Sequence, residues 1–337
     1  MESMKIVVRA PNWVGDAVLA LPAMATIKKG FPESEIMVAT EEWVEDLFSL
    51  SDMFPNSVSL PKQKGIQSFK DSVRKIREGR FDLGILLTNS FSSALVFAMA
   101  RIPQRWGYNK DGRGLLLTKR VPVQPKANRA HQVHYYLDLL SGLGLENDPE
   151  EFALAVNRQK IAETEAWLDA LNVQIKKPLV IINPGGYYGS AKRWPAKKYA
   201  ELASLIQDSY PAQVMIIGSA DEKPLAEAIS SRMETPPLVL SGQTNLSRLA
   251  ALISFADLFV TNDSGPMHLA NFLKVPVVAL FGPTEPARTG PFLEPSVVIH
   301  KGAPCWPCSY RQCPFDHRCM MDIAPEEVFQ SCQRLLG

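Results

Sequence analysis

Short apolar runs alternate along the chain with longer segments in which apolar residues recur at helical spacing. Lys5–Arg9 (KIVVR) and Leu258–Val260 contain unbroken apolar runs of the kind that form buried parallel strands. In Ala17–Lys29, by contrast, residues such as Leu19 and Ala23 fall on one face of a helix. This alternation predicts strand–helix units built around parallel sheets.

The same pattern continues through both halves of the chain. In the first half, further strands or extended pieces are predicted at Glu35–Thr40, Ser57–Leu60, Phe81–Thr88, Arg105–Tyr108 and Arg120–Val123, and helices at Glu41–Leu50, Ser68–Glu78, Ser92–Arg101 and His131–Leu140. A connecting strand, Glu151–Val156, and a helix, Gln159–Leu171, lead into the second half. There, further strands are predicted at Leu179–Asn183, Gln213–Gly218, Leu238–Leu240, Val275–Phe281 and Val297–His300, and helices at Ala196–Ser209, Glu222–Arg232, Leu246–Ser254 and Pro325–Leu336.

Two successive strand–helix series predict an α/β protein with two doubly wound domains that face each other across a cleft. The length of 337 residues suits two domains of ordinary size, which we place at residues 1–172 and 173–337. Open parallel sheets bind ligands at the carboxyl ends of their strands. Three loops should therefore carry the chemistry, namely those that follow Arg9, Asn183 and Val260.

The stretch Leu258–Ala270 (LFVTNDSGPMHLA) joins a strand to a helix through a turn of small and polar residues. Ser264 or Asp263 can cap that helix, and its first backbone N–H groups form a potential anion site. Gly265 lets a ligand approach the backbone, and His268 adds an imidazole. The competing interpretation is an ordinary capped helix whose histidine packs in the core.

Two more loops of the second half carry charged residues just after a strand. Pro184–Pro195 contains three glycines followed by Lys192, which suits a phosphate, although it matches neither a Walker A loop nor a dinucleotide fingerprint. In Gly218–Glu222, a carboxylate such as Glu222 can accept hydrogen bonds from ribose hydroxyls. A surface loop with solvated cations and a negatively charged helix start are the alternatives.

The loop after the first strand ends in Gly15 and Asp16. Gly15 permits a tight turn, and Asp16 stands where the next helix begins. Aspartate is a good helix cap, but at the end of a strand it is also a carboxylate that the first sheet presents to a ligand. Both interpretations of Asp16 stay open on these residues alone.

Composition and charge narrow the class of protein. The chain is 46% hydrophobic and 21% charged, with a formal net charge of +1, so no global feature points to nucleic acid or a membrane. No apolar run reaches the roughly 18 residues of a spanning helix. The N-terminus resembles a strand and not a signal peptide, so we expect a cytoplasmic protein with reduced thiols.

Basic residues exceed acidic ones between Arg101 and Ala130, where Asp111 is the only acid. This excess indicates an anionic partner, and a phosphorylated or carboxylated lipid headgroup fits it as well as nucleic acid does. Trp106 and Tyr108 are too few aromatic residues for a nucleic-acid stacking platform. A solvated basic face is the remaining interpretation.

Four cysteines lie close together near the C-terminus, at Cys305, Cys308, Cys313 and Cys319. Their spacing allows a structural zinc site, disulfides or free thiols, and the sequence does not decide among these. A fifth, Cys332, lies in the closing helix, where it is expected to be buried packing.

Five motifs in order resemble the bacterial lipopolysaccharide heptosyltransferases, glycosyltransferase family 9. They are NWVGDAVLALPA, PGGYYGSAKRWP, TNDSGPMHLA, VVALFGPTEPARTGP and CWPCSYRQCPFDHRCM. The resemblance covers nearly the whole chain, and the last motif is most similar to the heptosyltransferase II branch.

The resemblance implies a GT-B fold of two Rossmann-like domains and a metal-independent, inverting transfer of L-glycero-D-manno-heptose from ADP-heptose. The implied acceptor is heptosyl-Kdo2-lipid A of the lipopolysaccharide inner core. Asp16 then matches the catalytic base, Lys192 a phosphate-binding lysine and Glu222 a ribose-binding acid. The donor-binding turn is matched by Asp263, Ser264, Gly265 and His268. Trp106 departs from the family, which often has a small hydroxyl residue there.

We assign acceptor binding to the basic segment, through Arg101, Arg105, Arg113 and Arg120. No cofactor and no nucleic acid are expected, and a lipid acceptor implies peripheral contact with the cytoplasmic face of the inner membrane. The alternatives are heptosyltransferase I or III, which differ in acceptor, a nucleotide-sugar epimerase of similar two-domain form, and a nucleic-acid-binding protein.

Overall fold

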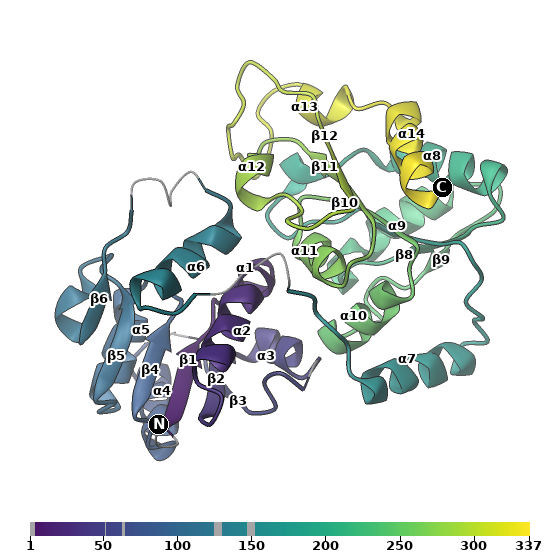
Figure 1. Ribbon diagram of the computed structural model, residues 1–337. Coiled ribbons are helices and arrows are strands. Elements are labelled where there is room, and N and C mark those ends of the chain that lie inside the picture. Colours follow the sequence, from purple (N-terminus) through teal and green to yellow (C-terminus); the bar gives the residue numbers. More distant parts are fainter. Residues whose placement is uncertain (1–3, 51, 63–64, 125–129, 147–151) are drawn as a thin grey trace. The chain divides into compact units, whose positions relative to one another are not determined.

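The computed structural model describes residues 4–50, 52–62, 65–124, 130–146 and 152–337. The chain divides into two compact units, Met1–Phe152 and Ala153–Gly337. Each unit contains one six-stranded sheet in which every pair of neighbouring strands is parallel (Figure 1). The predicted α/β class with two doubly wound sheets is therefore confirmed.

The sheet of the first unit has the strand order β3-β2-β1-β4-β5-β6. Its strands are β1 (Lys5–Arg9), β2 (Glu35–Glu41), β3 (Ser57–Leu60), β4 (Leu83–Leu86), β5 (Gln104–Tyr108) and β6 (Lys119–Val121). Its helices are α1 (Val14–Leu19), α2 (Leu21–Gly30), α3 (Glu42–Phe48), α4 (Ile66–Glu78), α5 (Phe91–Met99), the 3₁₀ helix η1 (Arg113–Leu116) and α6 (Gln132–Gly142). The order reverses between β1 and β4, so the loops after these two strands flank the switch point where such sheets bind ligands.

The second unit repeats this arrangement, with the order β12-β11-β10-β7-β8-β9. Its strands are β7 (Leu179–Asn183), β8 (Gln213–Ile216), β9 (Leu238–Val239), β10 (Leu258–Asn262), β11 (Val277–Phe281) and β12 (Ser296–His300). Its helices are α7 (Arg158–Ala170), η3 (Ser190–Lys192), α8 (Ala196–Ser209), η4 (Ala220–Glu222), α9 (Lys223–Ser230), α10 (Leu246–Ser254), α11 (Gly265–Phe272), α12 (Pro286–Thr289), α13 (Arg318–Met321) and α14 (Pro325–Leu336). Here the switch point lies between β7 and β10.

Two predicted elements differ from the structure. The expected helix Ala17–Lys29 is broken into α1 and α2, because Pro22 has no N–H with which to continue the first helix. The expected strand Glu151–Val156 is wrong over its described residues, which form no strand, and Glu151 lies outside them. In place of a ladder, the N–H of Leu154 donates a single hydrogen bond of 2.8 Å to the carbonyl of Phe272.

Helix α7 belongs to the second unit, although residues 1–172 were expected to form the first domain. It packs against α10, where the guanidinium of Arg248 lies 4.7 Å from the centre of the Trp167 ring. Because these contacts tie α7 to the second sheet, the units divide after Phe152 and not after residue 172.

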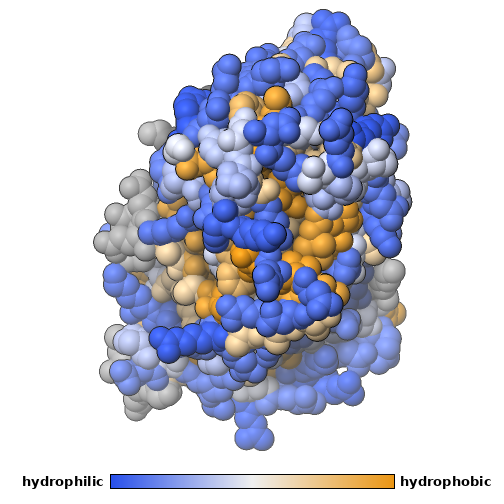
Figure 2. Space-filling view, turned by 90° about the vertical axis from the view of Figure 1, so that its right-hand side faces the viewer, coloured by the Kyte–Doolittle hydropathy of each residue, from blue (hydrophilic) through white to orange (hydrophobic). Residues whose placement is uncertain are grey.

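In the described part of the chain, no helix has the length and apolar character needed to cross a membrane. The face drawn in Figure 2 is covered mostly by hydrophilic side chains, with apolar side chains exposed between them. In the second unit, Trp194 and Tyr199 are almost fully buried in a core cluster to which residues of α8 and α14 contribute.

Candidate functional site

The two loops at the switch point of the second unit are joined by one buried amide, Asn262 at the end of β10. Its Nδ2 donates to the carbonyls of Pro184 (2.6 Å) and Gly185 (3.1 Å). Its Oδ1 accepts from the hydroxyl of Tyr199 (2.9 Å) and the N–H of Trp194 (3.2 Å). Asn262 therefore fixes both ends of the glycine-rich loop, a role that sequence reasoning missed because these partners lie far away in the chain.

Ser264 occupies the N-cap position of α11, but its side chain makes no cap hydrogen bond, contrary to expectation. Its hydroxyl accepts instead from Nδ2 of Asn183 (2.9 Å) and lies 3.1 Å from the hydroxyl of Thr261. These contacts join the ends of β7 and β10 across the switch point. The predicted residues Gly265 and His268 follow in the first turn of α11, and the imidazole of His268 is buried.

The carboxylate of Asp263 is the polar centre of this site. It is 5% exposed, and its Oδ2 accepts from Nζ of Lys192 (2.5 Å) and from the hydroxyl of Thr284 (2.6 Å). The ammonium of Lys192 also lies 4.8 Å from the centre of the Tyr188 ring. The structure thus brings together two residues predicted separately, Lys192 and Asp263, and adds Thr284 from the loop after β11.

Glu222 lies beside the same glycine-rich loop. Its Oε1 accepts from the N–H of Gly186 (2.6 Å), and its Oε2 accepts from the N–H of Ser219 (2.8 Å) in a capping box. A Cβ added at Gly185 would lie only 2.1 Å from Oε1, so a larger residue there would force this carboxylate to move. Glu222 therefore holds two loops together, which is compatible with either of its two predicted roles.

In the first unit, Asp16 is the third residue of α1 and half-buried. The N-cap residue is Trp13, so the capping interpretation of Asp16 does not apply. The charge of Asp16 adds to the effect of burial in raising the pKa of Tyr136 on α6, which indicates that the two side chains are close. Asp16 therefore stands at the carboxyl edge of the first sheet, beside the switch point.

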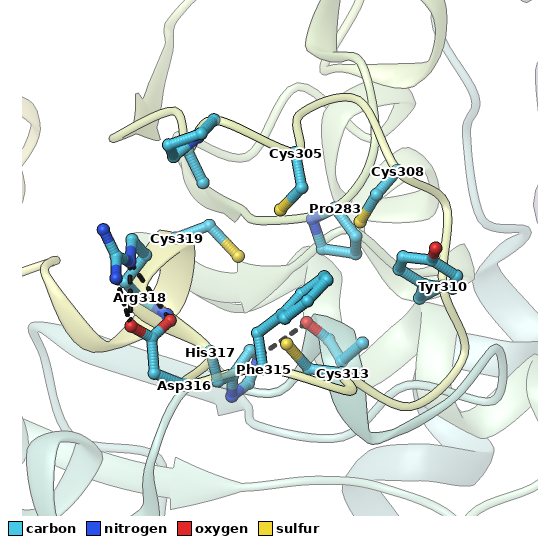
Figure 3. Close-up of a pocket in the computed structure, with 13 residues that line it drawn as sticks. Pro283, Cys305, Cys308, Tyr310, Cys313, Phe315, Asp316, His317, Arg318 and Cys319 are labelled. Atoms are coloured by element: carbon cyan, nitrogen blue, oxygen red, sulfur yellow. Dashed lines mark hydrogen bonds and ion pairs between the residues drawn. The ribbon is translucent and has the colours of Figure 1, made fainter.

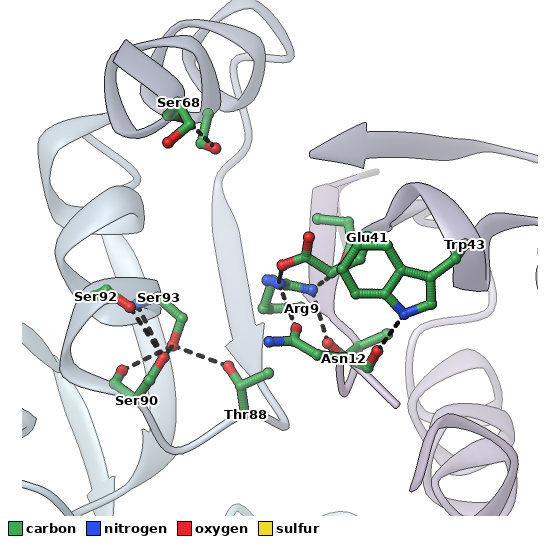
Figure 4. Close-up of polar contacts among 12 residues, drawn as sticks. Arg9, Asn12, Glu41, Trp43, Ser68, Thr88, Ser90, Ser92 and Ser93 are labelled. Carbon is green, nitrogen blue, oxygen red and sulfur yellow. Dashed lines mark hydrogen bonds and ion pairs between the residues drawn. The ribbon is translucent and has the colours of Figure 1, made fainter. Parts of the chain in front are cut away.

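The loop that leads to Asp16 is held by a buried arginine, Arg9 (Figure 4). Its guanidinium donates to the carbonyl of Ala10 (2.8 Å) and to Oδ1 of Asn12 (2.6 Å), and it pairs with Oε1 of Glu41 (3.1 Å). Trp43 donates from its indole N–H to the carbonyl of Asn12 (2.9 Å). Burial lowers the pKa of Arg9 and raises the pKa of Glu41, although their mutual attraction opposes both shifts.

Two of the four arginines assigned to the acceptor bind backbone carbonyls within the first unit. Arg113 is fully buried and donates from Nε to the carbonyl of Tyr108 (2.9 Å) and from Nη1 to that of Thr88. Burial lowers its pKa to about 10. Arg105 donates from Nε to the carbonyl of Leu116 (2.6 Å).

The four arginines do not gather at one edge of the sheet. Arg101 and Arg105 lie at the amino end of β5, opposite the edge that carries Asp16, whereas Arg113 follows β5 at the carboxyl edge. Arg120 is exposed on β6, and its side chain lies beside η1 at Gly114. The remaining basic residues Lys126 and Arg129 lie outside the described residues.

Trp106, where the sequence departs from the family pattern, packs against other side chains of the first unit. Its ring lies 6.3 Å from that of Phe31 at the end of α2, and the ammonium of Lys119 lies 4.7 Å from its centre. Trp106 is paired with Ile85 in the middle of the sheet, away from the loops at the carboxyl edge.

The four clustered cysteines of the second unit line one cavity of about 420 Å³ (Figure 3). All of them are free thiols, and burial together with the neighbouring thiols raises the pKa of Cys319 to about 11. No group of three or more His, Cys, Asp or Glu side chains in the described ranges is arranged to hold a metal ion. A site for a single zinc ion, one of the three possibilities that the spacing allows, is thus not formed among the described residues.

Comparisons with known proteins agree with this architecture. Residues 71–318 match the family model "Glycosyltransferase family 9 (heptosyltransferase)". The chain is 32% identical to lipopolysaccharide heptosyltransferase 2 of Salmonella typhimurium (99% of each chain) and 31% identical to lipooligosaccharide heptosyltransferase 2 of Campylobacter jejuni (99% of this chain, 98% of the other). It superposes on the solved ADP-heptose lipopolysaccharide heptosyltransferase II of Escherichia coli with a TM-score of 0.83, at 29% identity, over 99% of this chain and 98% of that one.

The two doubly wound units and their loops thus define a glycosyltransferase of the GT-B architecture. The chain belongs to glycosyltransferase family 9, the heptosyltransferases.

Proposed function

We propose that the protein transfers L-glycero-D-manno-heptose from ADP-heptose, with inversion, to the first heptose of the lipopolysaccharide inner core, heptosyl-Kdo2-lipid A. The observation that carries this proposal is similarity over both units to proteins named heptosyltransferase 2. Heptosyltransferase I and III differ in acceptor, and the similarity to the heptosyltransferase 3 of Escherichia coli is lower, at 26% identity.

The second unit binds the donor at its switch point in this proposal. The diphosphate lies between Lys192 and the first turn of α11, where Asp263, Ser264 and Gly265 form the turn. Negative charge grows on the departing ADP in the transition state, and the ammonium and the helix start stabilise it. Protein groups then supply the stabilisation that a divalent cation provides in other enzymes.

Two more residues contact the donor in the proposal. Glu222 accepts hydrogen bonds from the ribose hydroxyls, for which its carboxylate has lone pairs left beyond its two backbone contacts. His268, one turn into α11, contributes to the same pocket.

Asp16 of the first unit is the proposed general base. It takes the proton from the acceptor hydroxyl as that oxygen attacks the anomeric carbon of the donor. One displacement inverts the configuration, so no enzyme nucleophile is needed. The half-buried position of Asp16 beside the switch point of the first sheet supports this role.

The acceptor carries anionic groups, and we assign their recognition to the carboxyl edge of the first sheet. Arg120 is exposed there, whereas Arg113 is fully buried and is no longer included, because its guanidinium binds backbone carbonyls at the ends of β4 and β5. We no longer include Arg101 and Arg105, because they lie at the opposite edge. Peripheral contact with the cytoplasmic face of the inner membrane follows from a lipid-linked acceptor.

Acceptor specificity tests the proposed function. ADP release from ADP-heptose is measured with inner-core acceptors that carry no heptose or one heptose, in EDTA without added metal. Release with the one-heptose acceptor alone supports the proposal. Release with the heptose-free acceptor assigns the protein to heptosyltransferase I, and conversion of the donor without any acceptor favours the epimerase.

A further inference from the structure

The segment of residues 301–321 has little regular structure of its own. Its one helix in the described chain is α13, and large side chains such as Tyr310 and Phe315 are 46% and 64% exposed. Such a segment buries too little apolar surface to hold its shape by packing alone. Its four thiols, those of Cys305, Cys308, Cys313 and Cys319, all line one cavity (Figure 3).

The geometry of this cavity does not suit a single metal ion. A tetrahedral zinc with Zn–S bonds of about 2.3 Å holds its sulfur atoms about 3.8 Å apart. Among the described residues, no three cysteines are arranged closely enough to share one ion. Together with other side chains, the thiols instead line a cavity of about 420 Å³.

We propose that Cys305, Cys308, Cys313 and Cys319 bind an iron–sulfur cluster. Four cysteine thiolates are the ligand set of such clusters. Sulfide and iron ions placed between the ligands separate the cysteine sulfur atoms more widely than one ion does. The apolar residues Pro283, Ala303 and Phe315 line the same cavity.

The cluster has a structural consequence, because its segment is hydrogen-bonded to the loop after β11 and to the glycine-rich loop after β7. The N–H groups of Cys308 and Ser309 donate to the carbonyl of Pro283 (3.2 and 3.0 Å), and the indole of Trp306 donates to the carbonyl of Thr284 (3.0 Å). These contacts hold the loop that presents Thr284 to Asp263.

The second connection reaches the glycine-rich loop. Ala191, the residue before Lys192, donates from its N–H to the carbonyl of Arg311 (3.1 Å), and its own carbonyl lies 2.7 Å from Nε2 of His317. Tyr188 donates from its hydroxyl to the carbonyl of Ser309 (2.6 Å). The cluster thus acts as a cross-link that positions Lys192 and Thr284, and it takes no part in the transfer chemistry.

The test is the metal and sulfide content of the full-length protein, purified without oxygen. We expect iron and acid-labile sulfide in equal amounts, either two or four of each per chain, with the visible absorption of a thiolate-bound cluster. A Cys313→Ser variant should lose both. The control, Cys332→Ala, removes the buried thiol of α14 outside the cavity and should keep both.

Circular dichroism shows whether each variant is folded, and wild-type protein is also incubated with iron and sulfide under argon. A folded wild type that contains neither iron nor sulfide, even after this treatment, overturns the proposal. One zinc or one iron per chain without sulfide overturns it too, in favour of a single-ion site. These readouts do not depend on heptosyl transfer, so the cluster and the proposed function fail or succeed separately.

Discussion

In the proposed donor site, Asp263 fixes the position of the Lys192 cation. The two side chains are 6% and 12% exposed, and the Thr284 hydroxyl binds the same carboxylate oxygen. The ammonium is therefore held in one position before any phosphate arrives, which lowers the entropy that a ligand must lose on binding. The same pairing makes Asp263 dependent on its lysine, because a buried charge without a partner is costly.

We predict that Lys192→Met both weakens ADP binding and destabilises the protein. The change removes the cation from the diphosphate and leaves Asp263 without its partner, which costs about 3 kcal/mol or more in unfolding free energy. Isothermal titration with ADP and urea unfolding measure the two effects. The control is Lys197→Met, whose exposed side chain lies 3.7 Å from Glu201 on the same helix. Equal ADP affinity in both variants would remove Lys192 from the donor site.

The lowered pKa of His300 leads to a prediction of how the stability of the folded protein depends on pH. Burial lowers the pKa of His300, so the folded protein binds this proton more weakly than the unfolded chain does. Its contribution to stability is therefore present above the unfolded value of about 6.5 and is lost as the pH falls through the lower, folded value. The ring of His300 lies 4.6 Å from that of Trp306, next to the cysteine segment.

His300→Phe tests this dependence, because phenylalanine keeps an aromatic ring against Trp306 without a proton to bind. Thermal unfolding between about pH 7.5 and pH 5 should show a larger loss of stability in the wild type than in the variant. Identical losses in the two proteins would show that His300 makes no contribution.

At the scale of elements, the connection from β1 to α1 is fixed from both sides. Arg9 lies at the end of β1 and Glu41 at the end of β2, and their pairing holds Asn12 in the loop between β1 and Asp16. The neighbouring Trp43 binds the backbone of the same loop. This network sets the direction in which α1 leaves the sheet.

We predict that Glu41→Gln lowers the transfer rate and the stability together, while leaving the affinity for ADP unchanged. The change breaks a buried ion pair, which costs about 3 kcal/mol, and loosens the loop before Asp16 without touching the second unit. Steady-state kinetics, ADP titration and urea unfolding measure these effects. Glu42→Gln, at the exposed start of α3, is the matched control. A variant as active and stable as this control would contradict the positioning role.

Most elements could be predicted because parallel strands are buried on both faces and therefore appear as apolar runs. The failure at residues 152–156 has a clear physical cause. Phe152 and Leu154 are buried and Ala153 and Ala155 are exposed, so the alternation is real, but no strand lies alongside. Alternating buried and exposed residues show that one side of an extended segment is covered. They do not show that the segment is hydrogen-bonded to a neighbouring strand.

For the whole molecule, the order of the strands predicts where ligand sites are expected, because each sheet reverses its order once. The loops of Asp16, Lys192 and Asp263 could therefore be found from the sequence. The contacts that hold them could not, since Arg9 and Asn262 meet partners that local patterns do not reveal. The local excess of basic residues also gave a wrong expectation for Arg113. Its guanidinium is buried among backbone carbonyls, and composition does not show which arginines are buried in this way.

We propose that the two units divide the reaction between them, so that the second unit holds the donor and Asp16 of the first unit takes the proton. The most direct test compares Asp16→Asn with the wild type and with Glu33→Gln, an exposed carboxylate of the same unit. We expect kcat of Asp16→Asn to fall by about 10² to 10⁴-fold while the Kd for ADP-heptose stays at the wild-type value. Loss of donor binding, or a kcat equal to that of Glu33→Gln, would contradict the account.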